Sequence, residues 1–236
     1  MAGKQARIAR SVQVGVGVSL TAVAGFVDAV GYIELGGFFA SFMSGASISL
    51  GVGVAESRWA AVQHAGILVT AFVAAATAAS MISGMMRRWA LPTVLLLDGG
   101  CISAAALMAG TGWTPSVAVI PVVAAMGVQN TALRPVDGVR LGVTFMTGTL
   151  VSLSEALGRC LLGRAPWSGW SPHALVWCSF VAGAGAGALL HRAHGFLALA
   201  APAVVVSGMG AFIAFAVLVK ARKRQRSTAD LDGNPT

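Results

Sequence analysis

The chain has 236 residues, of which 56% are hydrophobic and only 10% are charged, and its mean hydropathy is +0.79. A soluble globular domain has about 25% charged residues, so this composition excludes a water-soluble fold and predicts an integral membrane protein. The net charge of +8 lies in short clusters between long apolar runs. This pattern is typical of a membrane surface, so we expect membrane lipid as a partner and no nucleic acid.

The N-terminal segment 1–11 is basic and is followed by the first apolar run at 12–33. This start resembles a signal peptide, and Ala22-Val23-Ala24 even supplies a cleavage-like site. Cleavage there would remove the first run from Gly25-Phe26-Val27-Asp28, which belongs to an internal repeat described below. We therefore expect an uncleaved first span.

Six stretches are apolar over about the 20 residues that a helix needs to cross the hydrocarbon core. They are 12–33, 59–84, 90–111, 115–133, 172–191 and 195–219. Two further segments, 36–54 and 141–154, are uncharged over 19 and 14 positions. At 1.5 Å per residue the second segment reaches only about 21 Å, against roughly 30 Å of hydrocarbon. We therefore expect both to be re-entrant or broken segments.

The distribution of Lys and Arg supports this topology. With six spans, 14 of these residues face one side and only Arg58 and Arg192 face the other, whereas eight full crossings would give 11 and 5. The positive-inside rule favours the first arrangement and predicts that both termini are cytoplasmic. The polar C-terminal segment 220–236 is predicted to be a basic, disordered tail attracted to anionic lipid.

One phrase occurs twice: residues 42–50 read FMSGASISL and residues 145–153 read FMTGTLVSL. Upstream, Gly25-Phe26-Val27-Asp28 aligns with Gly127-Val128-Gln129-Asn130. Each unit, 12–111 and 112–219, holds three spans. Because three is odd, the units must enter the bilayer in opposite orientations, which predicts an all-α integral membrane protein built as an inverted 3+3 repeat.

An inverted repeat is expected to bring the two phrases together near the membrane midplane, where irregular backbone is tolerated only inside protein or along a cavity. Gly45 and Gly148 allow a ligand to approach the backbone, and the neighbouring polar groups are able to bind a small polar solute or an ion. The polar residues that we expect in or beside this site are Ser41, Ser44, Ser47, Ser49, Gln129, Asn130, Thr144, Thr147, Thr149 and Ser152. Alternatively, each hydroxyl only bonds to the preceding helical turn and each glycine only permits packing.

Two acidic residues lie inside apolar runs, Asp28 in the first and Asp98 in the third. Ionisable groups at such depth are costly, and they usually mark an ion or substrate pathway. Asp98 has no acidic counterpart in the second unit, where the matching region reads LAAPAVV, and Asp28 is paired in the repeat with Asn130. The alternative for Asp28 is a hydrated position that only caps a helix end.

No cofactor or metal site is expected. Cys101, Cys160 and Cys178 have no paired spacing and are predicted to be packing residues. His191 and His194 flank Arg192 and would supply only two metal ligands, so an interfacial polar turn is the simpler interpretation.

Two blocks, AGFVDAVGYIELGGFFASFMSG and MGVQNTALRPVDGVRLGVTFMTGTLVSLSEAL, resemble the YoaK family (DUF1275) of bacterial multi-pass membrane proteins. The resemblance covers roughly residues 14–220 and implies a location in the bacterial inner membrane. Asp98 also falls where the family tends to place an acidic residue. The chain departs from the family pattern at Ser44-Gly45-Ala46, where Thr-Gly-Asn is expected. This difference puts a shared substrate specificity in question.

These features predict a small transporter or channel whose pathway includes a midplane site formed by the paired phrases. We expect the following residues to line it: Asp28, Ser44, Gly45, Asp98, Gln129, Asn130, Thr147, Gly148 and Thr149. A chain with six spans is small for transport, so a homo-oligomer is expected. The alternatives are a structural or regulatory membrane protein and, less favoured, a membrane-embedded enzyme, since no catalytic triad or carboxylate pair lies near the repeat.

Overall fold

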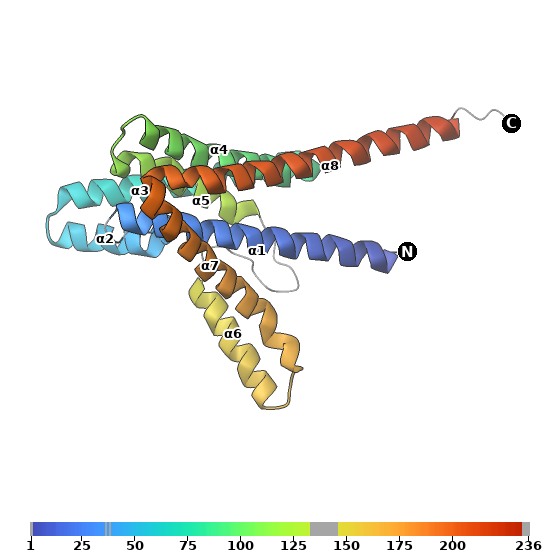
Figure 1. Cartoon of the computed structure of the whole chain (residues 1–236), viewed down its shortest axis with the longest axis horizontal. Coiled ribbons are helices and arrows are strands. Elements are labelled where there is room, and N and C mark those ends of the chain that lie inside the picture. Colours follow the sequence, from blue (N-terminus) through green and yellow to red (C-terminus); the bar gives the residue numbers. More distant parts are fainter. Residues whose placement is uncertain (1, 36, 38, 133–145, 233–236) are drawn as a thin grey trace.

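The computed structural model describes residues 2–35, 37, 39–132 and 146–232, and within these residues the structure is entirely helical (Figure 1). The α-helices are α1 (Ala2–Glu34), α2 (Met43–Ala55), α3 (Trp59–Met86), α4 (Ala90–Gly110), α5 (Pro115–Ala132), α6 (Met146–Leu161), α7 (Ser171–His194) and α8 (Ala200–Asp232). In the described part of the chain, three 3-10 turns lie between these helices: η1 (Arg87–Trp89), η2 (Trp167–Trp170) and η3 (Gly195–Leu199). The all-α prediction is therefore confirmed for the described residues.

Among the described residues, five segments are long and apolar enough to cross a membrane. They are Val14–Glu34, Trp59–Met86, Ala90–Gly110, Pro115–Ala132 and Trp167–Arg222, and the last of them contains both α7 and the apolar part of α8. An apolar segment in lipid must satisfy its backbone hydrogen bonds internally, and a helix does so. The helices are thus those of a multi-pass membrane protein.

The two helices that carry the repeated phrase are shorter than the others. α2 has 13 residues and α6 has 16, which correspond to lengths of about 20 and 24 Å. Both are regular helices almost from the first residue of the phrase. The expectation of irregular backbone at Ser44-Gly45 and Thr147-Gly148 is therefore wrong, because these dipeptides lie in the first turns of α2 and α6.

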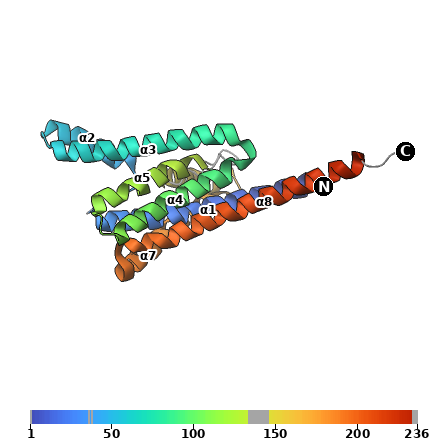
Figure 2. The ribbon, with the colours of Figure 1, turned by 90° about the horizontal axis from the view of Figure 1, so that it is seen from above.

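The long helices form a bundle from which one hairpin projects. α1, α4, α5 and α8 lie side by side, and α3 covers α5 on the opposite side of the molecule from α8 (Figure 2). The hairpin of α6 and the first half of α7 points away from this bundle, while α2 pairs with the start of α3 (Figure 1). Both termini lie at the same end of the molecule (Figure 1). The largest fully buried apolar side chains are Leu20, Leu95, Ile102, Met126 and Leu199.

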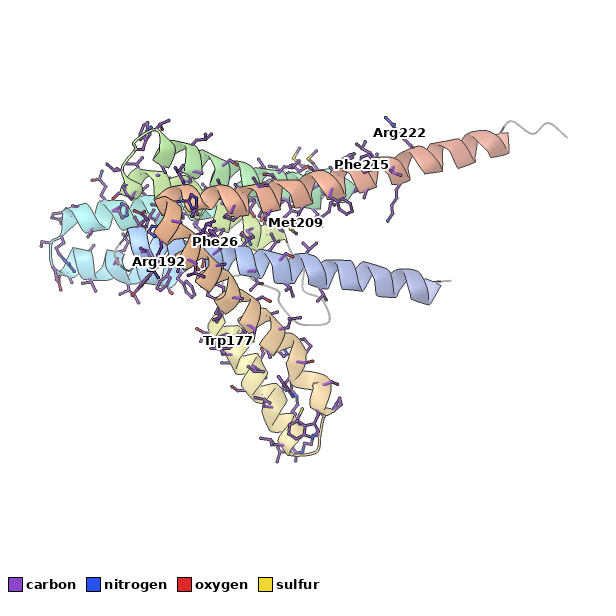
Figure 3. The ribbon with its side chains drawn as sticks, in the orientation of Figure 1. Phe26, Trp177, Arg192, Met209, Phe215 and Arg222 are labelled. Carbon is purple, nitrogen blue, oxygen red and sulfur yellow. The ribbon has the colours of Figure 1, made fainter. Side chains whose placement is uncertain are left out.

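Glycines allow two helix pairs to approach closely. In the α1–α7 pair, a Cβ added at Gly187 would lie 2.5 Å from the carbonyl oxygen of Phe26, and Gly25 and Gly183 are confined still more closely by the facing backbone. Phe26 lies where α1 meets α7 (Figure 3). In the α3–α5 pair, a Cβ added at Gly127 would lie 2.5 Å from the carbonyl oxygen of Phe72. Small residues are needed at such crossings because packing is the main force between helices in lipid.

The C-terminal segment differs from the prediction of disorder, since α8 continues as a helix through the basic residues to Asp232. Arg222 lies towards the end that carries both termini, and Arg192 lies at the opposite end (Figure 3). Arg134 and Arg140 lie outside the described residues.

Candidate functional site

Asp28 is buried near the end of α1 and holds the segment that leads into α2. Its side chain is 2% exposed, and its Oδ1 accepts a hydrogen bond of 2.8 Å from the backbone N–H of Ser41. The Ser41 hydroxyl donates a second, short hydrogen bond to Oδ2. Both carboxylate oxygens therefore have a donor, and the group fixes the chain one residue before the phrase FMSG begins.

Aromatic rings connect the same segment to α7. The Tyr32 and Phe39 rings stack at 5.0 Å, and Phe39 meets Phe42 edge-on at 5.2 Å. Phe42 in turn lies 6.5 Å from the ring of Phe180 on α7. Edge-to-face and offset pairs at these distances are favourable, so they help to position the start of α2.

The starts of the two repeated phrases converge at this point. Phe42, which precedes α2, and Met146, the first residue of α6, pack with Phe180 and Val176 in one small apolar cluster. The two helices then diverge, α2 towards its turn with α3 and α6 towards its turn with α7 (Figure 1). The structure thus brings the beginnings of the phrases together.

The hydroxyl and glycine positions of the phrases are mostly on the outside. Ser44, Gly45, Thr147 and Gly148 are exposed, whereas Thr149 is buried. A Cβ added at Gly45 would meet nothing within 4 Å. The helical face that each hydroxyl occupies decides its exposure, and the sequence of the phrase does not reveal that face.

The two amides of α5 have different partners. Gln129 is 1% exposed, and its Nε2 donates a hydrogen bond of 2.6 Å to the carbonyl oxygen of Leu20 on α1. Asn130 is half-buried, and its Nδ2 donates 2.8 Å to the carbonyl oxygen of Met126 one turn earlier. Gln129 thus ties α5 to α1, and its Oε1 has no hydrogen-bond partner among the described residues.

Asp98 is completely buried in α4, and neither of its carboxyl oxygens has a hydrogen-bond partner among the described residues. It lies beside the closest approach of α4 and α8, where a Cβ added at Gly99 would lie 2.9 Å from the backbone nitrogen of Ser207. On the same interface Gly210 packs against Leu95 and Leu96. An unpartnered carboxyl group in such apolar surroundings costs several kcal/mol. A buried group with this energetic cost is expected to serve a function, so Asp98 is the first candidate for a functional residue.

A polar side-chain pair that sequence reasoning missed joins the ends of α1 and α7. The Nε2 of His191 lies 2.7 Å from Oε1 of Glu34, and the two side chains are only 14% and 22% exposed. The two residues are 157 positions apart, so no local pattern reveals the contact. The ion pairs Glu56–Arg58 and Glu155–Arg159, by contrast, are exposed on the surface and contribute little to stability.

The described residues contain no group of three or more His, Cys, Asp or Glu side chains that would hold a metal ion. Cys101, Cys160 and Cys178 are all free thiols. Thr144, which the repeat aligns with Ser41, lies outside the described residues.

Comparison with known proteins identifies relatives along most of the chain. A family model described as "Protein of unknown function (DUF1275)" matches residues 16–215. The UPF0700 transmembrane protein RA0705 of Rhizobium meliloti (strain 1021) is 31% identical over 205 residues, which cover 85% of this chain and 88% of the relative. The UPF0700 transmembrane protein YoaK of Bacillus subtilis (strain 168) is 26% identical over 146 residues, or 58% of this chain and 63% of the relative. No solved structure has a significant match.

Proposed function

The chain belongs to the DUF1275 family of transmembrane proteins, and on that premise we propose that it is a transporter or channel for a small polar solute or an ion. Its pathway would pass the buried carboxyl group of Asp98, and the proposal includes no catalytic step. The single observation that carries it is that Asp98 is fully buried in an apolar helix with both oxygens unpartnered among the described residues. Ionisable groups in such positions usually mark ion or substrate pathways.

The helix crossings support an inverted repeat as the architecture of this transporter. A Cβ at Gly25 would meet Phe180 and Ala184, and a Cβ at Gly127, its counterpart in the second unit, would meet Phe72 and Ala76. Phe180 and Ala184 each follow Phe72 and Ala76 by 108 residues. Helix α1 of the first unit thus packs against α7 of the second unit in the same way as α5 packs against α3.

The α4–α8 interface supports the same symmetry. Gly99 and Ser207, which are again 108 residues apart, contact each other directly. Positions that a two-fold axis relates can touch only where they lie close to that axis. Asp98, next to Gly99, would then lie near the pseudo-symmetry axis, which is where inverted-repeat transporters bind their substrates.

The ends of the molecule support six spans with cytoplasmic termini in the bacterial inner membrane. The fifth apolar segment contains two helices, α7 and α8, which are joined by η3 and would each cross the membrane. Both termini lie at one end of the molecule, together with Arg222, while Arg192 lies at the other (Figures 1 and 3). A concentration of basic residues at the end with both termini fits the positive-inside rule.

The converging starts of α2 and α6 would form a second part of the pathway. Segments too short to cross the bilayer, which begin deep in the protein, are typical of transporters with broken helices. Here the two starts share the contact with Phe180, and the exposed Ser44 and Thr147 lie within the first turns. In this proposal they line an approach to the core and do not form the enclosed site themselves.

The test uses purified protein in proteoliposomes with a pH-sensitive dye inside. Gradients of a panel of ions and small polar solutes are imposed on wild type, on Asp98→Asn and on the exposed control Glu155→Gln. We expect at least one gradient to drive flux in wild type and Glu155→Gln and to drive none in Asp98→Asn. Folded wild-type protein that moves nothing across a broad panel would favour a structural or regulatory role.

A further inference from the structure

Three buried oxygen atoms in the bundle share an unusual property. Oδ1 and Oδ2 of Asp98 and Oε1 of Gln129 are the buried side-chain atoms without a hydrogen-bond partner among the described residues. Both side chains are 1% exposed or less. All three atoms are hydrogen-bond acceptors, apart from the one proton that a neutral carboxyl group would carry. Buried polar groups in native proteins are almost always satisfied, so an orphaned set of one kind is a sign of a missing partner.

The two side chains lie at the same level of the bundle. α4 and α5 are antiparallel neighbours joined by the short turn that follows Gly110 (Figure 2). At 1.5 Å per residue, Asp98 lies about 18 Å from the end of α4 and Gln129 lies about 21 Å from the start of α5. These two distances, measured from one turn along neighbouring helices, differ by only about 3 Å, the rise of two helical residues.

Gln129 is held in a fixed orientation. Its Nε2 donates to the carbonyl oxygen of Leu20 on α1, so its Oε1 is directed away from that bond and stays in the buried core. The amide therefore presents Oε1 as an acceptor in the core, where α5 lies beside both α1 and α4 (Figure 2). Gln129 is thus a preorganised neutral acceptor at the level of an acidic one.

Acceptor oxygens of this number and kind select the chemistry of a ligand. Calcium takes six to eight oxygen ligands and magnesium demands six in octahedral geometry, which is more than the three unpartnered oxygens supply. The buried neighbours Leu95, Ile102 and Met126 add no oxygen from their side chains. An anion would meet the acidic group unfavourably. A protonated amine carries three N–H donors and a positive charge, and it would satisfy the oxygens and offset the charge of Asp98.

We propose that Asp98 and Gln129 together form a binding site for an ammonium group, either the ammonium ion or the protonated amine of a small solute. This assignment deepens the proposed transport function and rests on it for the route by which the ligand enters. Within the site, Asp98 supplies the charge. Gln129 supplies a directional hydrogen-bond acceptor, which favours a cation that carries N–H groups over a cation that carries none.

The test measures thermal unfolding of the purified full-length protein in detergent, at constant ionic strength, with the chloride salts of five cations. Ammonium, methylammonium and ethanolammonium carry N–H donors, whereas tetramethylammonium and potassium do not. We expect the first group to raise Tm by about 5–10 °C at one hundred times their Kd, and the second group to leave it unchanged. Comparing ammonium with the two larger amines separates the bare ion from an amine solute.

Variants then locate the site. Asp98→Asn should abolish the shift and Gln129→Leu should weaken binding at least tenfold, while Glu155→Gln should bind like wild type. If either core variant fails to fold, the contrast between methylammonium and tetramethylammonium in wild type still decides the question. Equal stabilisation by both, or by none of the five salts, would overturn the assignment.

The outcome is separable from that of the transport proposal. Flux of a solute without an amine, dependent on Asp98, would retain transport and overturn the ammonium site. Binding of amines without any flux would retain the site and count against transport.

Discussion

Asp28 and Asp98 are both aspartates buried in apolar helices, yet their surroundings are opposite. Asp28 receives two hydrogen bonds from Ser41, and its carboxylate organises the segment before α2. Asp98 receives none from the described residues and lies beside the tightest α4–α8 contact. Depth in a membrane span is therefore not enough to identify a functional acid. A partnered acid holds the fold together, whereas an unpartnered acid is available for a ligand.

The largest expected effect concerns activity. Asp98→Asn keeps the shape of the side chain but removes its charge, so we expect flux in proteoliposomes to fall at least 100-fold. Asp28→Asn keeps an acceptor for Ser41 and should retain at least a tenth of wild-type flux. Equal losses in both variants would show that the two acids do not divide structural and functional roles as their contacts suggest.

The second prediction concerns stability, for which we expect the change at Asp28 to have a larger effect than the change at Asp98. Asp28→Ala leaves the buried N–H and O–H of Ser41 without an acceptor and should lower the free energy of unfolding by about 2–4 kcal/mol. Asp98→Leu replaces an unpartnered group with an apolar one of similar size and should leave stability unchanged or raise it by about 1 kcal/mol. Denaturant titration in mixed micelles measures both. A large loss in Asp98→Leu would mean that this carboxyl group has a structural partner.

A third prediction tests the hydrogen bonds between Asp28 and Ser41 by changing Ser41. Ser41→Ala removes one of the two donors to Asp28 and should cost about 1–2 kcal/mol. Ser47→Ala is the matched control, because the Ser47 hydroxyl only bonds to the carbonyl oxygen of Met43 in its own helix, and it should cost less than about 0.5 kcal/mol. In a double-mutant cycle, Ser41→Ala and Asp28→Ala should be non-additive, while Ser41→Ala and Asp98→Asn should add.

The smallest effect is expected at an acid of intermediate burial. Glu34→Gln weakens the pairing with His191 and should cost about 1 kcal/mol, since both side chains are mostly buried. The exposed control Glu155→Gln should change stability by less than about 0.5 kcal/mol. Thermal unfolding of both variants in one detergent compares them directly. Indistinguishable Tm values would place the Glu34–His191 pair with ordinary surface pairs.

Much of the fold was predictable because lipid imposes strong local rules. The apolar runs predicted the long apolar helices, and the charge of Glu155 predicted that the second phrase is too short for a crossing. The repeat also predicted the correspondence of Gly25 with Gly127, whose packing turns out to be equivalent.

The site was less predictable because it depends on which face of a helix each residue occupies. Ser44 and Thr147 look like ligand-binding hydroxyls in sequence, but helix packing leaves them exposed. Asp28 and Asp98 look alike in sequence, and only the distant Ser41 distinguishes them. The contact of Glu34 with His191 joins residues 157 positions apart in the sequence and leaves no local trace.

The glycine crossing of α1 and α7 has a consequence for how the protein is made. α1 reaches the membrane first, but the helix that fits its Gly25 surface is among the last to be synthesised. At about 5–20 residues per second, α1 must wait roughly 7–30 s for α7 to emerge from the ribosome. During that interval its small-residue face is open to lipid, to chaperones or to another nascent chain. The two halves, expressed as separate polypeptides, would then assemble through the contact of α1 in the first half with α7 in the second half.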